Sequence, residues 1–516
     1  MRVVLVSPEM AIPQLGEPMC GANFRGGLGL LAGDIAECLN NEGSITTVCI
    51  VPFHGTHWLS RASISYEGTL ARLWGLLPER EGREPKIPVW VIHRGRCDIY
   101  GVSVPGVLYT GDRRERLSQE VLLGHILPVI LKGRSSQPPD ILWLNEGHTV
   151  VALARMRDDD WFKSTRFLFT THTARPEGRE RFPADWFEDL GISPSFRPIF
   201  MKDGCMDFTA AAMTLAHGVT AVSKEHADVT KEMFPEHRTK ITGIRNGLSP
   251  SLWQSPSLTA LDGNVPYSVL TEAQEAAKAV LIELIERKTG IRLNPRKALG
   301  GLVRRVAWYK NQLPMLAPII EAVCAERGEV ISTPFGNLEG LGLQVFIAGV
   351  AHEDDGRCQE WTRDFEQWME RPQLKGRFVY VRDYTFELLQ LGPQGCELWP
   401  SCSLPGDEAC GQSDQRATLN GNVNVATKTG GAMEYIKEVD PESGEGNGCF
   451  IEPYGPLTLY EKLKLLSNLY HATLSNGDPR WARIRMNSLE SSNMLDGKHM
   501  VNQYKTVFAS LQGGST

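Results

Sequence analysis

The stretch Arg25-Gly26-Gly27-Leu28-Gly29-Leu30-Leu31-Ala32-Gly33-Asp34 follows shortly after Val3–Val6, an apolar run typical of a buried strand. Glycine at 26, 27 and 29 lets the backbone approach an anion closely, and the apolar residues behind it predict a helix with unsatisfied N–H groups at its start. The order of strand, glycine turn and helix predicts an α/β domain with Gly26 and Gly27 as a candidate phosphate cradle. A purely structural glycine turn is the alternative.

The same alternation continues along the chain, where short apolar runs alternate with longer amphipathic ones. This pattern predicts strand–helix–strand units and mostly parallel sheets. The predicted strands lie at 3–6, 47–51, 89–93, 141–144, 167–170, 219–222, 301–306, 344–348, 378–381 and 424–426.

The length of 516 residues predicts more than one core. The segment 254–294 begins with Pro and Ser residues and continues into a helix-forming stretch, so we interpret it as a linker. The predicted organisation is then a domain at 1–253, the linker, a second domain at 295–490 and a terminal helix with its tail at 491–516.

Composition narrows the classes of function. A net charge of −7 argues against a nucleic-acid or anionic-membrane partner. The start of the chain lacks the pattern of a signal peptide, and apolar runs long enough to span a membrane are absent from the sequence. Eleven scattered cysteines indicate reduced thiols. We therefore expect a cytoplasmic protein, with a homodimer left open.

Two cations stand five residues apart in Arg304-Arg305-Val306-Ala307-Trp308-Tyr309-Lys310, at the end of a predicted strand. Ligands of open α/β folds bind at the carboxyl ends of strands, so Arg305 and Lys310 are candidate phosphate ligands. Two solvated surface charges are the alternative.

A carboxylate precedes a small turn in Asp407-Glu408-Ala409-Cys410-Gly411-Gln412-Ser413. Glu408 is a candidate ligand of sugar hydroxyls, and the backbone at Cys410 and Gly411 is a candidate for contacts with donor oxygens. An ordinary acidic helix start is the alternative.

Polar residues also follow two predicted strands of the first half: Asn145 and His148 after one, and His172, flanked by threonines, after the next. Neighbouring strand ends face the same crevice, which makes these residues candidate substrate ligands. For His148 a structural role is the alternative. The acidic run at 352–355 is interpreted as a polar loop, and no metal site is predicted.

Taken together, the motifs resemble the α-glucan (glycogen) phosphorylases, enzymes with a glycosyltransferase-B fold. The runs 26–34, 145–148, 171–173, 206–234, 241–253 with Asn246, 305–310 and 408–421 stand in that family's order. The segments 428–434 and 446–453 instead resemble bacterial glycogen and starch synthases. The resemblance implies two Rossmann-like domains facing each other across a cleft, with a C-terminal helix crossing back. It also implies roles for His172 at the sugar and for Asn246 in substrate binding.

The chain departs from the phosphorylases at one chemically decisive position. In that family a Lys eight residues after the motif's Glu forms the Schiff base with pyridoxal phosphate, and here the position is Arg416. A guanidinium stays protonated and cannot form that aldimine. The resemblance therefore implies a cofactor-free enzyme in which Arg416 adds charge to the phosphate site.

These observations predict a retaining, metal-independent glycosyltransferase. Arg305 and Lys310 would neutralise the leaving diphosphate of a nucleotide-diphosphate sugar, and Gly26 and Gly27 would contact it from the first domain. For the acceptor we expect a small molecule, as in natural-product or antibiotic biosynthesis. The alternatives are a glycogen or α-glucan synthase, a phosphorylase without pyridoxal phosphate and an inactive sugar-binding homologue.

Overall fold

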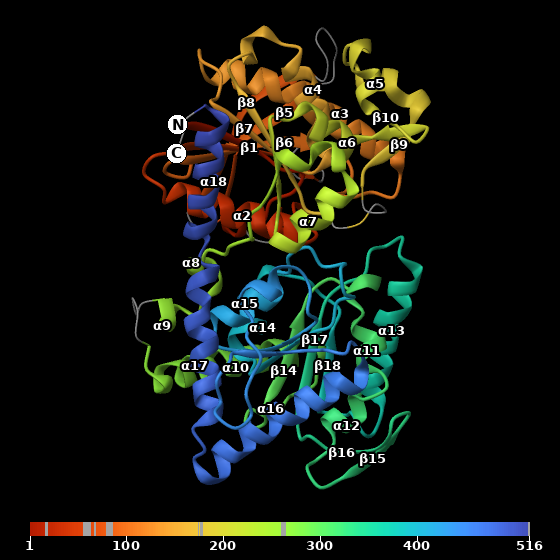
Figure 1. Ribbon diagram of the computed structural model, residues 1–516, viewed down its shortest axis with the longest axis vertical. Helices are drawn as coiled ribbons and strands as arrows, with labels where there is room; N and C mark the ends of the chain where they lie inside the picture. The colour runs from red at the N-terminus through yellow and green to blue at the C-terminus, as the bar shows by residue number, and fades with distance from the viewer. Residues whose placement is uncertain are drawn as a thin grey trace. The chain divides into compact units, whose positions relative to one another are not determined.

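The computed structural model describes residues 1–15, 19–54, 63–66, 69–78, 86–173, 175, 179–259 and 265–513. It divides the chain into two compact units (Figure 1). Unit 1 consists of Met1–Gly247 and Gly497–Thr516, and unit 2 of Leu248–Asp496. Each unit is an α/β domain built on a largely parallel sheet, as the sequence pattern predicts.

The main sheet of unit 1 has ten strands in the described residues. They are β1 (Arg2–Val6), β2 (Thr46–His54), β3 (Ser63–Tyr66), β4 (Thr69–Pro78), β5 (Lys86–Ile92), β6 (Cys97–Val104), β7 (Ile141–Asn145), β8 (Arg166–Thr171), β12 (Gly218–Ala221) and β13 (Ile241–Gly243). Their order is β13-β12-β8-β7-β1-β2-β6-β5-β4-β3. The strands from β13 to β6 are parallel, whereas β5, β4 and β3 extend the sheet antiparallel.

Helices cover both faces of this sheet. Those of unit 1 are α1 (Met19–Ala22), α2 (Gly27–Asn40), α3 (Arg113–Arg134), α4 (Val150–Arg157), α5 (Arg197–Phe200), α6 (Phe208–Leu215), α7 (Lys224–Met233) and α18 (Gly497–Leu511). A small antiparallel sheet joins β9 (Arg181–Pro183), β10 (Met201–Lys202) and β11 (Cys205–Asp207).

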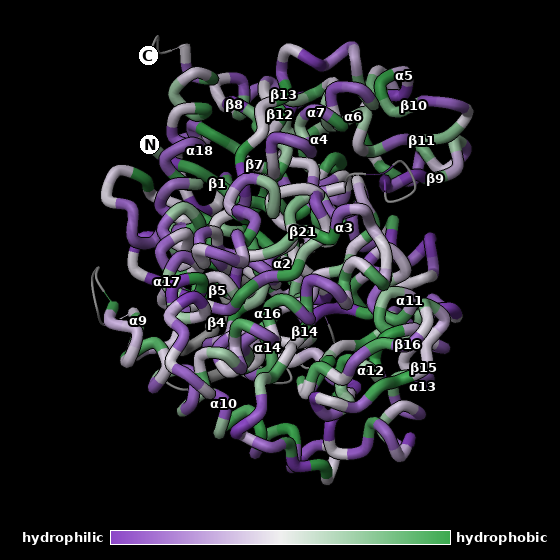
Figure 2. The backbone as a smooth tube through the Cα atoms, turned by 60° about the horizontal axis from the view of Figure 1, so that its bottom comes forward, coloured by the Kyte–Doolittle hydropathy of each residue, from purple (hydrophilic) through white to green (hydrophobic). Residues whose placement is uncertain are grey.

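The alternation of β1 shows how the two faces are filled. Val4 and Val6 belong to the core beneath α3, α4 and α6, whereas Val3 and Leu5 belong to the core beneath α2 and α18. The terminal helix α18 thus returns to unit 1, as predicted, and its Tyr504 ring lies 4.0 Å from that of Trp143 on β7. Hydrophobic and hydrophilic stretches alternate along the backbone (Figure 2).

Unit 2 has a parallel sheet of six strands within the described residues: β14 (Leu299–Val303), β17 (Gln344–Ala348), β18 (Phe378–Val381), β19 (Leu398–Ser401), β20 (Val423–Ala426) and β21 (Gly448–Phe450). Their order is β18-β17-β14-β19-β20-β21. A separate hairpin joins β15 (Val330–Thr333) and β16 (Gly336–Glu339).

The helices of unit 2 are α8 (Pro250–Trp253), α9 (Pro256–Thr259), α10 (Tyr267–Thr289), α11 (Gln312–Leu316), α12 (Ile320–Cys324), α13 (Gly356–Glu370), α14 (Phe386–Gly395), α15 (Ser413–Leu419), α16 (Pro456–Asn476) and α17 (Arg480–Ser491). In the described residues, none of the helices of either unit is long and apolar enough to cross a membrane.

The division differs from the predicted one, because the segment predicted as a linker is part of unit 2. Its helix α10 packs on α14 through Leu281 and buries Lys278, whose ammonium lies 2.9 Å from Glu397. A helix with a buried apolar face and a buried ion pair belongs to a core. The sequence suggested a linker because Pro and Ser precede that helix.

The chain passes from unit 1 to unit 2 after Gly247 and returns to unit 1 after Asp496. In unit 2, Leu248 pairs with Asp496, and its N–H donates to the Leu495 carbonyl over 2.8 Å. In unit 1, a Cβ added to Gly247 would lie 2.8 Å from Gly497 Cα. Only glycine permits this close approach.

Candidate functional site

The polar cluster of unit 2 forms around Glu408 at the carboxyl ends of β14 and β19. Arg304 directly follows β14, and Ser403 follows β19, its parallel neighbour. Glu408 Oε2 accepts hydrogen bonds from Arg304 Nη2 over 2.7 Å, from Ser403 Oγ over 2.9 Å and from Lys310 Nζ. Adjacent strand ends therefore assemble two cations and one carboxylate, as expected for a ligand site of this fold.

Charge controls the ionisation of Glu408. Burial alone would raise the pKa of this carboxyl, but the Lys310 and Arg304 cations and the hydrogen bonds from Lys310 and Ser403 lower it to about 2. Glu408 is therefore ionised at neutral pH, and the three side chains together carry one net positive charge. That surplus suits an anionic ligand.

The structure places Lys310 in this cluster and adds Arg304, whose guanidinium contacts Glu408, while the role of Arg305 as a phosphate ligand stays a prediction. Arg304 is 4% exposed and also donates to Ser401 Oγ over 2.9 Å. Arg305 is half-buried, and its carbonyl accepts from Gln312. Sequence reasoning missed Arg304 because it stands beside another Arg. Its place one residue after a buried strand was the available signal.

The residues predicted beyond Glu408 lie in the loop and helix that follow it. Cys410 is buried and accepts a weak hydrogen bond from Gln415, while Gly411 packs against Asp414. Their contacts with donor oxygens stay a prediction.

Arg416 on α15 is 2% exposed, and its guanidinium lies 4.7 Å from the ring centre of Trp253. A buried guanidinium stacked on indole does not fit the lysine aldimine of pyridoxal phosphate. The contact with Trp253 also gives Arg416 a packing role that the prediction of a phosphate-site charge did not include.

In unit 1, the start of α2 already contains an anionic group from the protein. Glu9 Oε2 accepts from the N–H of Arg25 over 2.7 Å and from that of Gly26 over 3.3 Å. A Cβ at Gly29 would lie 2.9 Å from the same oxygen and 2.6 Å from Phe24 Cβ. The glycine turn therefore accommodates the Glu9 carboxylate. The predicted phosphate contact through Gly26 and Gly27 stays a prediction. The Gly26 N–H that it would use donates to Glu9 in this structure.

The ends of β7 and β8 bring together Asn145, Glu146 and His172. His172 Nε2 lies 3.3 Å from Asn145 Oδ1, so its neutral ring can donate to that amide. The Glu146 carboxylate accepts from the His172 N–H over 2.5 Å and from the Thr173 hydroxyl over 3.0 Å. The structure thus brings Asn145 and His172 together at neighbouring strand ends, and their contact with substrate stays a prediction.

Glu146 is a residue of this group that sequence reasoning missed. Its φ of 61° lies in the left-handed region, which is uncommon for a non-glycine residue and concentrates at functional sites. Burial raises the pKa of its carboxyl to about 7, against the hydrogen bonds from His172 and Thr173 that lower it. Burial also lowers the pKa of His172 to about 3.

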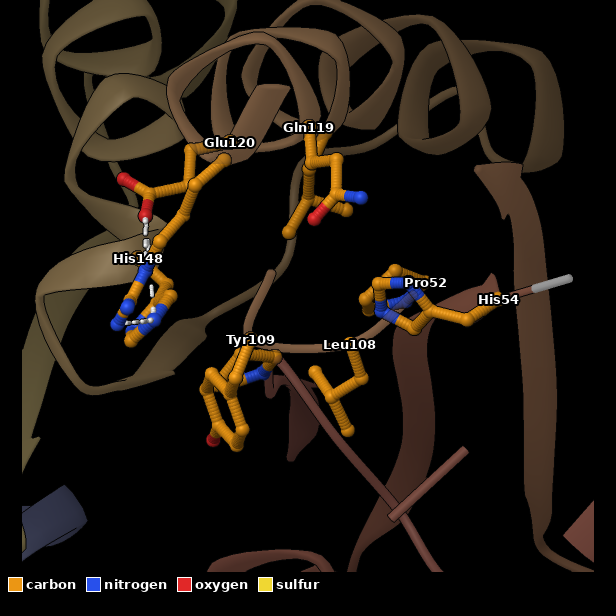
Figure 3. Close-up of a pocket in the computed structure, with 10 residues that line it drawn as sticks. Pro52, His54, Leu108, Tyr109, Gln119, Glu120 and His148 are labelled. Atoms are coloured by element: carbon orange, nitrogen blue, oxygen red, sulfur yellow. Dashed lines mark hydrogen bonds and ion pairs between the residues drawn. The ribbon is translucent and has the colours of Figure 1, made fainter. Parts of the chain in front are cut away.

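His148 lies beside helix α3, where it contacts Arg116. Its Nε2 lies 3.2 Å from Arg116 Nη2 and 3.3 Å from Glu180 Oε1. Glu120 completes this group and, with Pro52, His54, Leu108, Tyr109 and Gln119, lines a pocket (Figure 3). Burial, followed by the Arg116 charge, lowers the pKa of His148.

The remaining predictions concern Asn246 and metal ions. Asn246 is buried, and its N–H donates to the Val222 carbonyl. Its contact with substrate stays a prediction. In the described part of the chain, Glu120, His148 and Glu180 form the one group with three metal-ligand atoms within 4.8 Å of one another. In the run at 352–355, Asp355 caps α13.

Comparison with known proteins supports the architecture. The family model described as the starch synthase catalytic domain matches residues 2–241. The catalytic domain of starch synthase IV from Arabidopsis thaliana, solved with ADP and acarbose, superposes with a TM-score of 0.76 at 18% identity, covering 99% of both chains.

Curated relatives include both synthases and phosphorylases. A maltodextrin phosphorylase from Thermococcus litoralis is 25% identical over 78% of this chain and 54% of its own length. A glycogen synthase from Treponema denticola is 24% identical over 71% of this chain and 70% of its own length. The chain spans 54% and 60% of the lengths of the first two phosphorylases that it matches.

These similarities agree with the resemblance that the motifs suggested. The part of the chain that matches the starch synthase catalytic domain contains Gly26, Asn145 and His172. The chain has the glycosyltransferase-B fold and is similar to starch and glycogen synthases and to α-glucan phosphorylases.

Proposed function

We propose that this chain is a glycosyltransferase of the starch or glycogen synthase type, which transfers a sugar from a nucleotide-diphosphate donor with retention at the anomeric carbon. The observation that carries the proposal is the cluster of Arg304, Lys310 and Glu408 at the carboxyl ends of β14 and β19. Its surplus positive charge suits a diphosphate, and ADP is bound in the starch synthase of similar fold.

In this mechanism the cluster works by electrostatic stabilisation. Negative charge develops on the diphosphate as the glycosidic bond breaks, and Lys310 can donate to it while Glu408 holds the ammonium in place. We propose Arg305, one residue from Arg304, as a second guanidinium at the diphosphate, as the sequence predicts. Because these cations supply the positive charge, we propose that the reaction needs no metal ion.

The acceptor is proposed to be an α-glucan. The relatives named above are enzymes of starch, glycogen and maltodextrin. They favour this alternative over the small-molecule acceptor that the sequence led us to expect. We further propose that pyridoxal phosphate has no part in the reaction, because buried Arg416 occupies the position of the Schiff-base lysine.

The test uses radiolabelled ADP-, UDP-, GDP- and dTDP-glucose, each with and without a maltopentaose primer. Primer-dependent label in the glucan together with released nucleoside diphosphate supports the proposal. Label in a small-molecule product alone would support a glycosyltransferase with a small-molecule acceptor. Glucose 1-phosphate formed from glucan and inorganic phosphate would point to a phosphorylase. Absence of all three reactions would indicate the inactive sugar-binding homologue.

A further inference from the structure

His226 stands in the first turn of helix α7, beside the strand end that carries His172. Strand β8 lies between β7 and β12 in the sheet, and the parallel register pairs Thr171 with Ala221. One residue further on, His172 is therefore opposite Val222, the residue before the N-cap of α7. The ring of His226 contacts Val222 and thus belongs to the same edge of the sheet as His172.

Two contacts with the turn before α7 fix the position of His226. Its Nδ1 accepts from the Val222 N–H over 3.2 Å, and its backbone N–H donates to Ser223 Oγ over 3.1 Å. Burial lowers the pKa of the ring to about 4, so the ring is neutral at neutral pH. Because Nδ1 accepts and is unprotonated, the one proton of the neutral ring is on Nε2. The side chain therefore has a single N–H donor, at Nε2.

This Nε2 donor meets the backbone of Thr173. A backbone interaction with Thr173 raises the pKa of His226, against the lowering by burial. The partner is the Thr173 carbonyl, because a backbone N–H would favour the neutral ring and lower the pKa instead. Within the described residues Nε2 is buried and forms no hydrogen bond of normal geometry. The donor and the carbonyl are therefore close but not well aligned.

The segment that contains His172 and Thr173 is held from its other side by Glu146. The carboxylate of Glu146, which follows β7, accepts from the His172 N–H over 2.5 Å and from the Thr173 hydroxyl over 3.0 Å. Since β8 lies between β7 and β12, residues 172–173 pass between this carboxylate and the ring of His226. Hydrogen bonds of active sites are often poorly aligned without ligand and tighten when it binds.

A capping role accounts for one ring nitrogen of His226 but not for the other. Ser223 and His226 are the N-cap and N3 residues of α7, and the cap uses Nδ1. His217 of the same unit has a comparable Nδ1, which accepts from the Phe167 N–H over 3.0 Å. His217 precedes β12, at the opposite edge of the sheet from the strand ends discussed above. It therefore serves as a matched control for a ring that supports the backbone.

We infer that His226 is a positioning residue for sugar transfer: its Nε2–H holds the Thr173 carbonyl and thereby fixes His172 for its contact with the sugar. The contact between His172 and sugar rests on the proposed function. The hold on residues 172–173 rests on the hydrogen bonds and the strand register alone. His226 acts through its neighbours and is not assigned a contact with the substrate.

Two substitutions separate the roles of the two nitrogens. His226→Asn places an amide oxygen near the position of Nδ1, which keeps an acceptor for Val222 and removes the Nε2 donor. His226→Gln is one carbon longer and places an amide nitrogen near the position of Nε2. His217→Asn makes the first change in the control ring. The kcat and KM of each full-length protein are measured with ADP-, UDP-, GDP- and dTDP-glucose and maltopentaose, and the Thr173 carbonyl carbon is followed by NMR without ligand.

We expect His226→Asn to lower kcat about tenfold or more and to leave the KM for the nucleotide sugar within about threefold, because it displaces a group at the reacting sugar. His226→Gln should restore kcat to within about threefold of the wild type, and His217→Asn should leave it there. The Thr173 carbonyl signal should move in His226→Asn, return toward its wild-type position in His226→Gln and stay in place in His217→Asn. If His226→Asn does not fold, the wild-type ring decides: a proton on Nε2 supports the inference, and a proton on Nδ1 overturns it.

The inference is overturned if His226→Asn transfers sugar as fast as His217→Asn, or if His226→Gln is no more active than His226→Asn. It is also overturned if the Thr173 carbonyl signal is the same in His226→Asn and in the wild type. Wild-type turnover that these variants do not change would refute the inference and leave the proposed function standing. A wild type that transfers no sugar would refute the proposed function and the role of His226 in transfer together, which distinguishes the two failures.

Discussion

Arg304 Nη2 lies 2.7 Å from Glu408 Oε2, and the two residues are 104 positions apart in the sequence. The contact exists because β14 and β19 are parallel neighbours whose carboxyl ends meet. Since Arg304 is almost fully buried and Arg305 is half-buried, two adjacent arginines have different surroundings. We interpret Arg304 as a support for the carboxylate and Arg305 as a ligand of the donor.

Separate substitutions of the two arginines test that difference. Arg304→Ala leaves Glu408 with one cation fewer and should lower the free energy of unfolding by about 3 kcal/mol, as for removal of one partner of a buried ion pair. Arg305→Ala should lower that free energy less than Arg304→Ala does and should reduce turnover about 100-fold or more. Urea unfolding and sugar-transfer rates measure both, and equal loss of stability in the two variants would contradict the assignment.

Glu146 predicts a pH dependence of stability. Its carboxyl has a folded-state pKa of about 7 against an ordinary value of 4.5, so the fold prefers the protonated form. Its stabilising contribution is therefore complete below pH 4.5 and is lost as the pH rises through 7. The loss amounts to about 3 kcal/mol at most.

Thermal unfolding at pH 5 and pH 8 measures this effect in the wild type and in Glu146→Gln. The wild-type Tm should fall more between pH 5 and pH 8 than the Tm of the variant. The titration of Glu120 and Glu180, whose pKa values burial also raises, is common to both proteins. An identical change of Tm in the two proteins would show that Glu146 is ionised throughout.

Arg416 predicts how the chain responds to pyridoxal phosphate. Incubation with pyridoxal phosphate followed by borohydride reduction should leave residue 416 unlabelled, because a guanidinium forms no imine at neutral pH. Activity before and after exhaustive dialysis should be equal. Peptide mapping by mass spectrometry and the absorbance near the imine band provide the readouts, and an activity that requires added pyridoxal phosphate would contradict the prediction.

The parts of this fold that follow from local pattern could be predicted from the sequence. The predicted strands at 344–348 and 378–381 coincide with β17 and β18, because buried parallel strands are continuous apolar runs. The antiparallel extension by β5, β4 and β3 depends on pairing partners that no local pattern specifies. Helix α10 was assigned to a linker since only its contact with α14 shows that it is part of a core.

The candidate site could likewise be predicted from the sequence only in part. Asn145 and His172 stand at strand ends and could be found by that rule, whereas Lys310 and Glu408 lie in the segments that follow β14 and β19 and were found from their motifs. Glu9 could not, because the Gly26 turn indicates a site for an anion without showing that a carboxylate of the same chain lies there. His148 and His172 follow neighbouring strands, yet His148 contacts Arg116 and Glu180 whereas His172 contacts Asn145, which no local pattern specifies.

The measurement that most directly tests the central claim is the affinity for ADP and UDP of the wild type, Lys310→Ala and Lys428→Ala. Lys428 is an exposed lysine of the same unit that pairs with Glu452 and serves as the control. If the cluster around Glu408 binds a diphosphate, at least one of the two nucleotides binds the wild type, Lys310→Ala raises its Kd about 100-fold or more and Lys428→Ala leaves it within about threefold. Equal affinity of all three proteins for both nucleotides, or binding of neither, would contradict the account.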